Sequence, residues 1–248
     1  MSLKNRMADD PSFAPFNRDV EKNRGYLYTT RARLSSQLAN RRLTQAALEI
    51  VSLGGKRVVD IGCGDGTYTR DLFDEGRPAS LHGIDPAAGG IKVAKGNTGT
   101  RPIVYEVQSA YDLSFDDNSF DVAHLRGVLH HMDRPFDAIK EAFRVAPILV
   151  IIEPNGYNPV LKLLERYSSY HISHGEKSYP PRLLDRWVAE SGGRVAASHW
   201  AGLVPFFCPD WLAKTTKAVE PLIERLPLLK RICCAVYVSL AVRTKTSQ

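Results

Sequence analysis

The stretch Val58-Val59-Asp60-Ile61-Gly62-Cys63-Gly64-Asp65-Gly66 decides the fold, because an apolar β-type run breaks there into three alternate glycines and a helical pattern follows. Glycine at every second position permits positive φ angles and lets a ligand lie against the main chain without meeting a Cβ atom. We therefore expect a strand, a ligand-binding loop and a helix start. An ordinary βα turn is the alternative interpretation of the same residues.

The composition is typical of a globular protein with a core of its own. The chain has 248 residues, of which 44% are hydrophobic, enough to fill one α/β domain. The formal net charge of +6 comes from Lys and Arg scattered along the chain, which indicates solubility or an acidic substrate and disfavours nucleic acid as the partner. Four cysteines without a C-x-x-C pair or a metal-type spacing with histidine predict a reduced, cytoplasmic protein with no metal site.

Strand-like runs alternate with helical patterns through the middle of the chain. After the opening stretch, strands are expected at 80–84, 103–107, 120–125 and 148–152, with helices near 68–73, 91–94 and 135–143. Such alternation predicts βαβ units and a doubly wound, Rossmann-like parallel sheet. Two helices are expected ahead of it, between Tyr26 and Leu53, and Asp133 is expected to cap the helix that begins at Pro135.

The last third of the chain has a different character. Helices are expected at 158–170 and 182–190, late strands at 195–204 and 235–242, and a helical insert at 211–229 between them. We expect one domain in three parts: an N-terminal arm and helices (1–53), a cofactor-binding core (54–155), and substrate-side inserts with the last strands (156–248). The arm and the inserts would form a lid. No apolar run reaches the about 20 residues of a membrane span, no signal peptide is recognisable, peripheral membrane contact stays open, and the oligomeric state is not predicted.

The glycine spacing distinguishes two kinds of cofactor. A dinucleotide fold has G-x-G-x-x-G, whereas the third glycine position here is Thr67 and no Tyr-x-x-x-Lys dyad occurs. A nucleotide with an amino-acid tail suits the site better, with Asp60 near an ammonium group, main-chain amides near a carboxylate, and Asp85 accepting two ribose hydroxyls. S-adenosylmethionine is such a molecule. A nicotinamide-dependent oxidoreductase and a non-catalytic cofactor-binding subunit stay open as alternatives.

Five motifs in order resemble the class I S-adenosylmethionine-dependent methyltransferases, in particular the small-molecule branch (methyltransferase type 11) that includes ubiquinone and menaquinone biosynthesis enzymes. The motifs are residues 58–66, 82–85, 112–122, 128–132 and 190–193. The resemblance covers about residues 45–200 and implies a seven-stranded sheet with an antiparallel last strand, methyl transfer, and release of S-adenosylhomocysteine. The cofactor-binding residues that it implies are Asp60, Gly62, Cys63, Gly64, Asp85, Pro86, Ser109, Ala110, Tyr111 and Arg126, the last through its backbone.

Two departures from the family pattern bear on the substrate. Ser109 stands where such enzymes usually carry an aspartate that hydrogen-bonds the adenine amino group. Leu125-Arg126-Gly127-Val128 replaces the Asn-Pro-Pro-Tyr type motif of enzymes that methylate planar amino groups of nucleic acids. The second departure disfavours DNA as a substrate.

Histidine is the expected general base, because its pKa lies near the working pH. His130 and His131 follow the fourth expected strand, and the resemblance points to the same segment. Glu153, at the end of the fifth strand, would orient that histidine; its alternative role is to cap the turn at Asn155-Gly156. The alternative for one histidine is packing beneath the helix.

The acceptor is expected to lie under polar loops and aromatic side chains. The candidate contacts are Tyr28, Asn155, His171, His174 and Tyr179, three of which belong to the polar loop 170–179. The aromatic segment Pro205–Trp211 would form an apolar acceptor wall or a membrane-facing lip. We therefore expect methyl transfer to oxygen or nitrogen of a small or lipid-like metabolite.

Overall fold

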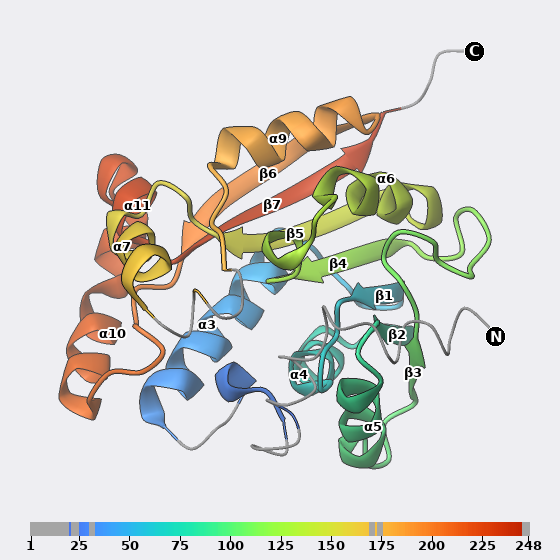
Figure 1. Ribbon diagram of the computed structural model, residues 1–248, viewed down its shortest axis with the longest axis horizontal. Coiled ribbons are helices and arrows are strands. Elements are labelled where there is room, and N and C mark those ends of the chain that lie inside the picture. The colour runs from blue at the N-terminus through green and yellow to red at the C-terminus, as the bar shows by residue number, and fades with distance from the viewer. Residues whose placement is uncertain (1–19, 21–24, 30–32, 169–171, 173–175, 245–248) are drawn as a thin grey trace.

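The computed structural model describes residues 20, 25–29, 33–168, 172 and 176–244. It shows one mixed sheet with helices on both faces (Figure 1). Nearly all of the expected N-terminal arm, and most of the loop at 170–175, lie outside the described residues.

The sheet has seven strands in the order β3-β2-β1-β4-β5-β7-β6. Strand β7 runs antiparallel to both of its neighbours, β5 and β6, and the pairings from β3 to β5 are parallel. The expected doubly wound sheet with an antiparallel last strand is thus confirmed. The strands are β1 (Arg57–Ile61), β2 (Ser80–Asp85), β3 (Ile103–Val107), β4 (Val122–Arg126), β5 (Ile148–Pro154), β6 (Gly193–Ala201) and β7 (Val236–Arg243).

The core consists of two apolar layers separated by the sheet. One layer packs β-strand side chains such as Val59 and Leu125 under helices α6 (Pro135–Val145) and α9 (Pro181–Glu190). The other layer packs side chains such as Val58 and Val150 under α3 (Leu34–Ile50), α4 (Thr67–Gly76) and α5 (Ala88–Asn97). Burial on both faces explains the nearly continuous apolar runs of β4 and β5.

Some boundaries differ from the sequence-based expectation. Between Tyr26 and β1 the described residues form one long helix, α3, and a 3-10 turn, η2 (Leu27–Thr29); residues 34–50 contain no glycine or proline that would divide α3. Arg134, not Asp133, occupies the N-cap position of α6, and it makes no side-chain capping bond. The late insert is two helices, α10 (Asp210–Arg225) and α11 (Pro227–Cys233), which are divided where proline interrupts the helix.

Two further elements are η3 (Leu129–His131), a 3-10 turn after β4, and the helix α7 (Pro159–Tyr167) after β5. Asn158 caps α7, and its side chain accepts hydrogen bonds from Val160 N and Leu161 N. No helix of the described part of the chain combines the length and the apolar character that crossing a bilayer requires.

A buried ion pair joins the inserted helix α10 to the core. The Arg42 guanidinium on α3 lies 2.7 Å from Glu224 of α10, and the two side chains are 10% and 14% exposed. Glu224 also accepts a hydrogen bond from Gly202 N at the end of β6. Since these contacts hold helix and strand end together, they stabilise the placement of α10 on the sheet.

Glu224→Gln is expected to lower the free energy of unfolding by about 2–4 kcal/mol, because it leaves the buried Arg42 cation without one of its two carboxylates. The matched control is Glu190→Gln, since the Glu190 partner Arg186 is solvent-exposed and such pairs contribute less than about 1 kcal/mol. Urea unfolding of both variants measures the difference. Equal effects would show that the Arg42–Glu224 pair does not anchor α10.

Candidate functional site

The glycine loop after β1 owes its sequence to packing. Gly62, Gly64 and Gly66 all have positive φ angles, of 80°, 57° and 73°. A Cβ atom on Gly62 would lie 2.4 Å from Val128, and one on Gly64 would lie 2.7 Å from the Tyr26 ring. The glycines therefore let the loop turn tightly and let protein side chains approach it closely.

The amides of this loop bond to the protein itself. Gly62 N and Cys63 N donate to the Ile84 carbonyl of β2, and Gly66 N donates to the carbonyl of Cys63. Gly64 N donates to Asp85 at 3.0 Å. Because β2 and the loop itself accept hydrogen bonds from all four amides, the expectation that main-chain amides of this loop surround a ligand carboxylate stays a prediction.

Asp60 lies beneath the loop and does not line it. Its carboxylate oxygens lie 2.7 Å from His124 Nδ1 and 2.6 Å from the Thr69 hydroxyl, and the residue is 3% exposed. Both oxygens are thus engaged by β4 and α4. Asp60 thus positions the start of α4, and direct contact of its carboxylate with a ligand ammonium group stays a prediction.

The segment just before α3 covers the glycine loop. Tyr26 N and the Thr29 hydroxyl both donate to Asp65 in the loop, at 2.9 and 2.5 Å. The Tyr28 ring packs against Phe206 and Phe207, with centroid separations of 5.2 Å to each. Tyr28 therefore belongs to an aromatic cluster that joins the N-terminal segment to the segment before α10.

Asp85, the last residue of β2, is bonded directly to the loop. Its two carboxylate oxygens accept hydrogen bonds from Gly64 N and Ala87 N, and Pro86 follows it in the turn to α5. Burial raises the pKa of Asp85 to about 6, against the lowering effect of the two amides. A carboxylate with spare lone pairs here can accept hydroxyl groups from a ligand.

The residues after β3 form a tight turn. Ser109 pairs with Asp112 in an isolated bridge, and its hydroxyl accepts a hydrogen bond from Tyr111 N at 3.2 Å. Ala110 is buried in the apolar layer under α6. The Tyr111 hydroxyl accepts from Arg134 N at 3.3 Å, so the turn is attached to the start of α6 and its position is defined.

Arg126, the last residue of β4, carries a buried guanidinium group. The group donates to Thr44 and Asn40 of α3 at 2.9–3.3 Å and lies 3.7 Å from the Tyr68 ring centroid. No ion pair joins Arg126 to a carboxylate among the described residues, and burial lowers its pKa. The side chain, which the sequence analysis had left unused, thus provides positive charge between the sheet and α3.

Glu153 organises the turn after β4. It is fully buried, and one carboxylate oxygen accepts hydrogen bonds from Val128 N and Leu129 N at 2.9 and 2.8 Å. The other oxygen lies 2.7 Å from His130 Nδ1. Glu153 therefore orients the His130 ring, as the sequence suggested. Its alternative assignment, capping of the turn at Asn155-Gly156, is not what these bonds show.

Glu176 is the site residue that the sequence analysis missed. His130 Nε2 lies 3.2 Å from Glu176, and His131 Nε2 lies 3.9 Å from it. Burial alone would lower the pKa of His130, but Glu153 and Glu176 outweigh burial and raise it to about 10. His130 is thus an imidazolium between two carboxylates at neutral pH. The sequence analysis selects the histidines and the tyrosine of the loop 170–179, and no spacing pattern marks Glu176 as a site residue.

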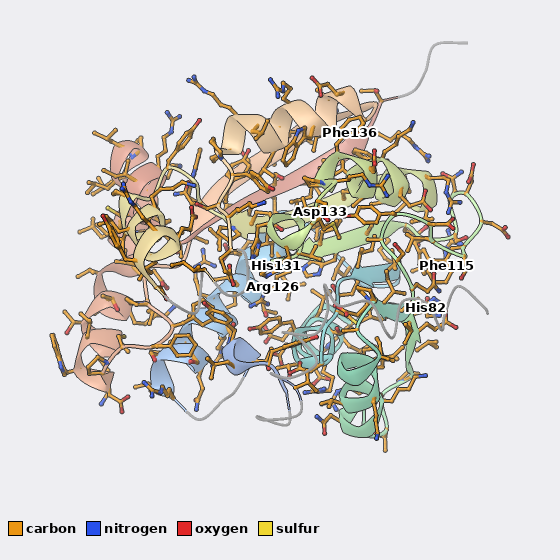
Figure 2. All side chains as sticks on the ribbon, viewed as in Figure 1. His82, Phe115, Arg126, His131, Asp133 and Phe136 are labelled. Carbon is orange, nitrogen blue, oxygen red and sulfur yellow. The ribbon has the colours of Figure 1, made fainter. Side chains whose placement is uncertain are left out.

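His130, His131 and Glu176 form a compact group at the end of β4. One ligand atom from each lies within 4.8 Å of the others. Nitrogen and carboxylate donors at this spacing are the kind that a divalent cation accepts, although the sequence analysis expected no metal. His131 and Arg126 both project from the segment in which β4 leaves the sheet (Figure 2).

The residues that the sequence analysis expects to contact the acceptor differ in their surroundings. Asn155 is fully buried, and its side-chain amide donates to the Arg231 and Cys234 carbonyls at 2.8 and 3.0 Å. This corrects its assignment as a substrate contact, because its polar atoms hold α11 to β5. Tyr179 packs its ring on Trp187 with the centroids 4.9 Å apart. His171 and His174 lie outside the described residues.

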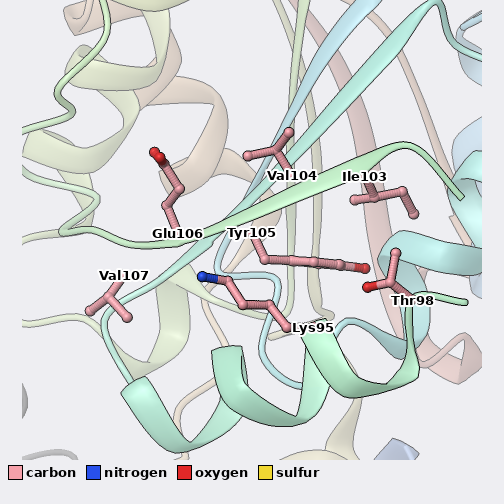
Figure 3. Close-up of a pocket in the computed structure, with 7 residues that line it drawn as sticks. All are labelled: Lys95, Thr98, Ile103, Val104, Tyr105, Glu106 and Val107. Carbon is pink, nitrogen blue, oxygen red and sulfur yellow. The ribbon is translucent and has the colours of Figure 1, made fainter.

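An open depression of about 550 Å³ lies elsewhere, along β3 and α5 (Figure 3). Its lining includes no residue of the glycine loop, η3 or β5; the lining residues are Lys95, Thr98, Ile103, Val104, Tyr105, Glu106 and Val107. It is therefore separate from the cluster of Asp85, Arg126 and His130 at the carboxyl ends of β2 and β4, where ligands of doubly wound sheets bind.

Comparison with known proteins finds methyltransferases that are similar to parts of this chain. Residues 59–147 match the family model of a methyltransferase domain. The tRNA U34 carboxymethyltransferase of Hahella chejuensis is 34% identical over 134 residues, which are 50% of this chain and 41% of that protein. The phthiotriol/phenolphthiotriol dimycocerosates methyltransferase of Mycobacterium tuberculosis is 30% identical over 155 residues, which are 62% of this chain and 50% of that protein. The chain thus spans half or less of the length of these relatives.

A solved structure extends the similarity in fold to nearly the whole chain. The S-adenosylmethionine-dependent methyltransferase of Thermotoga maritima, described as a possible histamine N-methyltransferase, matches with a TM-score of 0.69 and 17% identity. The match covers 94% of this chain and 100% of that one. Sequence motifs, sheet order and family model agree: residues 59–147 match a methyltransferase domain, and the sheet has the fold of S-adenosylmethionine-dependent methyltransferases.

Proposed function

We propose that this protein transfers a methyl group from S-adenosylmethionine to an oxygen or nitrogen atom of a small or lipid-like acceptor. The observation that carries the proposal is the His130 ring, held at Nδ1 by the buried Glu153 and facing Glu176 through Nε2. A histidine fixed in this way can move a proton at one defined atom. It follows β4, the strand next to the one that carries the glycine loop.

Charged groups on the cofactor side support the same proposal. Asp85 would accept ribose hydroxyls with the lone pairs that Gly64 N and Ala87 N leave open. The buried Arg126 guanidinium has no carboxylate partner among the described ion pairs, so an anionic group such as a carboxylate would compensate its charge. When bound, S-adenosylmethionine supplies a methyl group on a positively charged sulfur, and the protein residues bind, orient and accept protons.

In the mechanism that we propose, the acceptor displaces the Glu176 carboxylate from His130 Nε2. With Glu176 in place, Nε2 of His130 carries a proton and cannot act as a base. When a neutral acceptor replaces that carboxylate, His130 would lose one of the two charges that raise its pKa and would release its Nε2 proton to solvent. The acceptor would then give its proton to Nε2 and an electron pair to the methyl group, whose bond to the cofactor sulfur would break, while Glu153 would stabilise the resulting imidazolium.

The acceptor class follows from the apolar residues near the site. The cluster of Tyr28, Phe206 and Phe207 offers an apolar wall, and the Mycobacterium tuberculosis relative is named as a methyltransferase of phthiotriol dimycocerosates. Both favour a lipid-like acceptor. The relative named as a tRNA U34 carboxymethyltransferase makes tRNA the alternative that has to be tested beside it.

The decisive experiment measures binding and transfer separately. Titration calorimetry with S-adenosylmethionine and S-adenosylhomocysteine should show binding, whereas NADH should not bind. Methyl-labelled S-adenosylmethionine is then incubated with a lipid extract, a small-metabolite extract or bulk tRNA, each with and without EDTA. Label in the lipid or metabolite fraction supports the proposal; label in tRNA alone refutes the acceptor class, and absence of cofactor binding refutes the function. Loss of transfer with EDTA would show that a cation at His130, His131 and Glu176 replaces His130 as the activating group.

His130→Gln is expected to lower kcat by about 100- to 10,000-fold, the usual contribution of a general base, with the cofactor Kd unchanged. Calorimetry and the transfer assay measure the two effects. The control is His82→Gln, on β2 away from η3, which should retain activity. A His130→Gln variant with full kcat would remove histidine from the mechanism.

Glu176→Gln is expected to lower the pKa of His130, because one of the two carboxylates that raise it is lost. Titration of the imidazole resonances by NMR in both proteins measures this shift. Glu190→Gln is the control, since Glu190 is exposed at the end of α9 and pairs with Arg186. An unchanged His130 titration in the Glu176→Gln variant would show that Glu176 does not contact the ring in solution.

Cofactor affinity is expected to depend on pH through Asp85. The ionised carboxylate accepts hydrogen bonds from two hydroxyl groups better than the neutral acid does, and burial raises the pKa of Asp85 to about 6. Affinity should thus be constant above about pH 7 and fall by up to about tenfold per pH unit below pH 6. Calorimetry between pH 5 and 7.5 measures it, and Asp85→Asn should bind weakly with no such dependence. A wild-type affinity that does not change over this range would contradict the assignment of Asp85.

A further inference from the structure

Helix α7 presents an uncovered apolar stripe. None of its residues is buried, and Val160, Leu163, Leu164 and Tyr167 are exposed, with Leu163 at 58% and Tyr167 at 70%. Their spacing of i, i+3, i+4 and i+7 places all four on one side of the helix. A helix on the surface of a globular protein normally packs such a stripe against the core. The exposed stripe of α7 is therefore a candidate binding surface for an apolar partner.

The neighbouring helices α10 and α11 extend the apolar surface. The exposed large apolar residues of these helices, with Leu226 between them, are Trp211, Val219, Leu222, Leu226, Leu228 and Ile232. Asn158, the N-cap of α7, donates to the carbonyls of Cys233 and Cys234 at the end of α11. Figure 1 shows α7, α10 and α11 together at one end of the molecule. We call the exposed sides of these three helices the docking face.

Charge on the docking face is segregated. The three helices carry seven Lys and Arg residues and four carboxylates. Three of the carboxylates point inward: Glu220 is buried, and the side chains of Glu224 and Glu165 are mostly covered and paired with cations. Exposed cations include Arg166, Lys214 and Arg225. The face thus combines apolar and aromatic side chains with positive charge.

We propose that the docking face binds the surface of an anionic lipid membrane. Amphipathic helices with basic polar sides and with leucine, tryptophan or tyrosine on the other side lie in the headgroup region of bilayers. Basic residues add attraction to anionic lipids. Charge complementarity is the reason to prefer this partner to a second copy of the chain, because two copies of this face would bring like charges together.

The docking face is connected to the acceptor side of the site. Lys162 of α7 donates to the Ser178 carbonyl at 2.6 Å, and Glu165 of α7 accepts a hydrogen bond from the Ser178 hydroxyl. Ser178 lies two residues after Glu176, which contacts His130. Docking would therefore bring the segment of Glu176 and Ser178, which connects α7 to His130, close to the lipid that holds a membrane-dissolved acceptor. This consequence rests on the proposed function, whereas docking itself does not.

The test measures vesicle binding of the full chain without cofactor or acceptor. Flotation is carried out with vesicles of phosphatidylcholine alone or of phosphatidylcholine with phosphatidylglycerol. We expect binding to the anionic vesicles, at least about tenfold weaker binding to the neutral ones, and a decrease with salt. The double variant Leu163→Glu/Tyr167→Glu should bind the anionic vesicles at least about tenfold less.

The matched control is Val104→Glu, an equally drastic change at an exposed apolar residue of the edge strand β3. It should bind like the wild type, and circular dichroism verifies that all variants are folded. No flotation, or equal loss in the Val104→Glu variant, overturns the proposal. Self-association in sedimentation velocity that is abolished by Leu163→Glu/Tyr167→Glu, without vesicle binding, would assign the face to a second copy of the chain instead. These outcomes are independent of methyl transfer, which is measured separately.

Discussion

The arrangement of the site depends on one fully buried carboxylate, that of Glu153. A buried charge is costly unless hydrogen bonds satisfy it, and Glu153 accepts three: from two amides of the turn after β4 and from His130. These bonds couple β5 to β4 and determine the direction of the His130 ring. Removing the carboxylate would leave the two amides of the turn and the His130 ring without these hydrogen bonds. The same side chain therefore holds the turn after β4 and orients the histidine of the site.

On the cofactor side, buried polar groups are likewise satisfied by hydrogen bonds within the protein. Asp60 is bound by His124 and Thr69, and the amides of the glycine loop donate to β2 and to the loop itself. Among the described residues, the Asp85 carboxylate and the Arg126 guanidinium are the groups that we propose to bind the cofactor. Their opposite charges match the hydroxyl and carboxylate groups of a nucleotide that carries an amino acid.

The docking face gives the late inserts a second role. The ion pair of Arg42 with Glu224 attaches α10 to the core, and the hydrogen bonds of Asn155 and Asn158 attach the end of α11 to β5 and α7. Because these polar groups bond to other parts of the protein, the outer sides of the helices consist largely of apolar and basic residues. Since Lys162 and Glu165 of α7 also hold the chain next to Glu176, binding at the outer surface and access to His130 are mechanically linked.

The sequence by itself determined the sheet, the cofactor class and the His130–Glu153 pair, because these depend on local patterns: apolar runs, alternate glycines and residues that follow strand ends. Only the tertiary structure decided the roles of Glu176, Arg126 and Asn155. Each depends on atoms brought together from distant parts of the chain: Glu176 with His130, Arg126 with α3, and Asn155 with α11. No local spacing encodes such contacts. The same reason explains why glycine was expected to make room for a ligand at Gly62 and Gly64, whereas it makes room for Val128 and Tyr26.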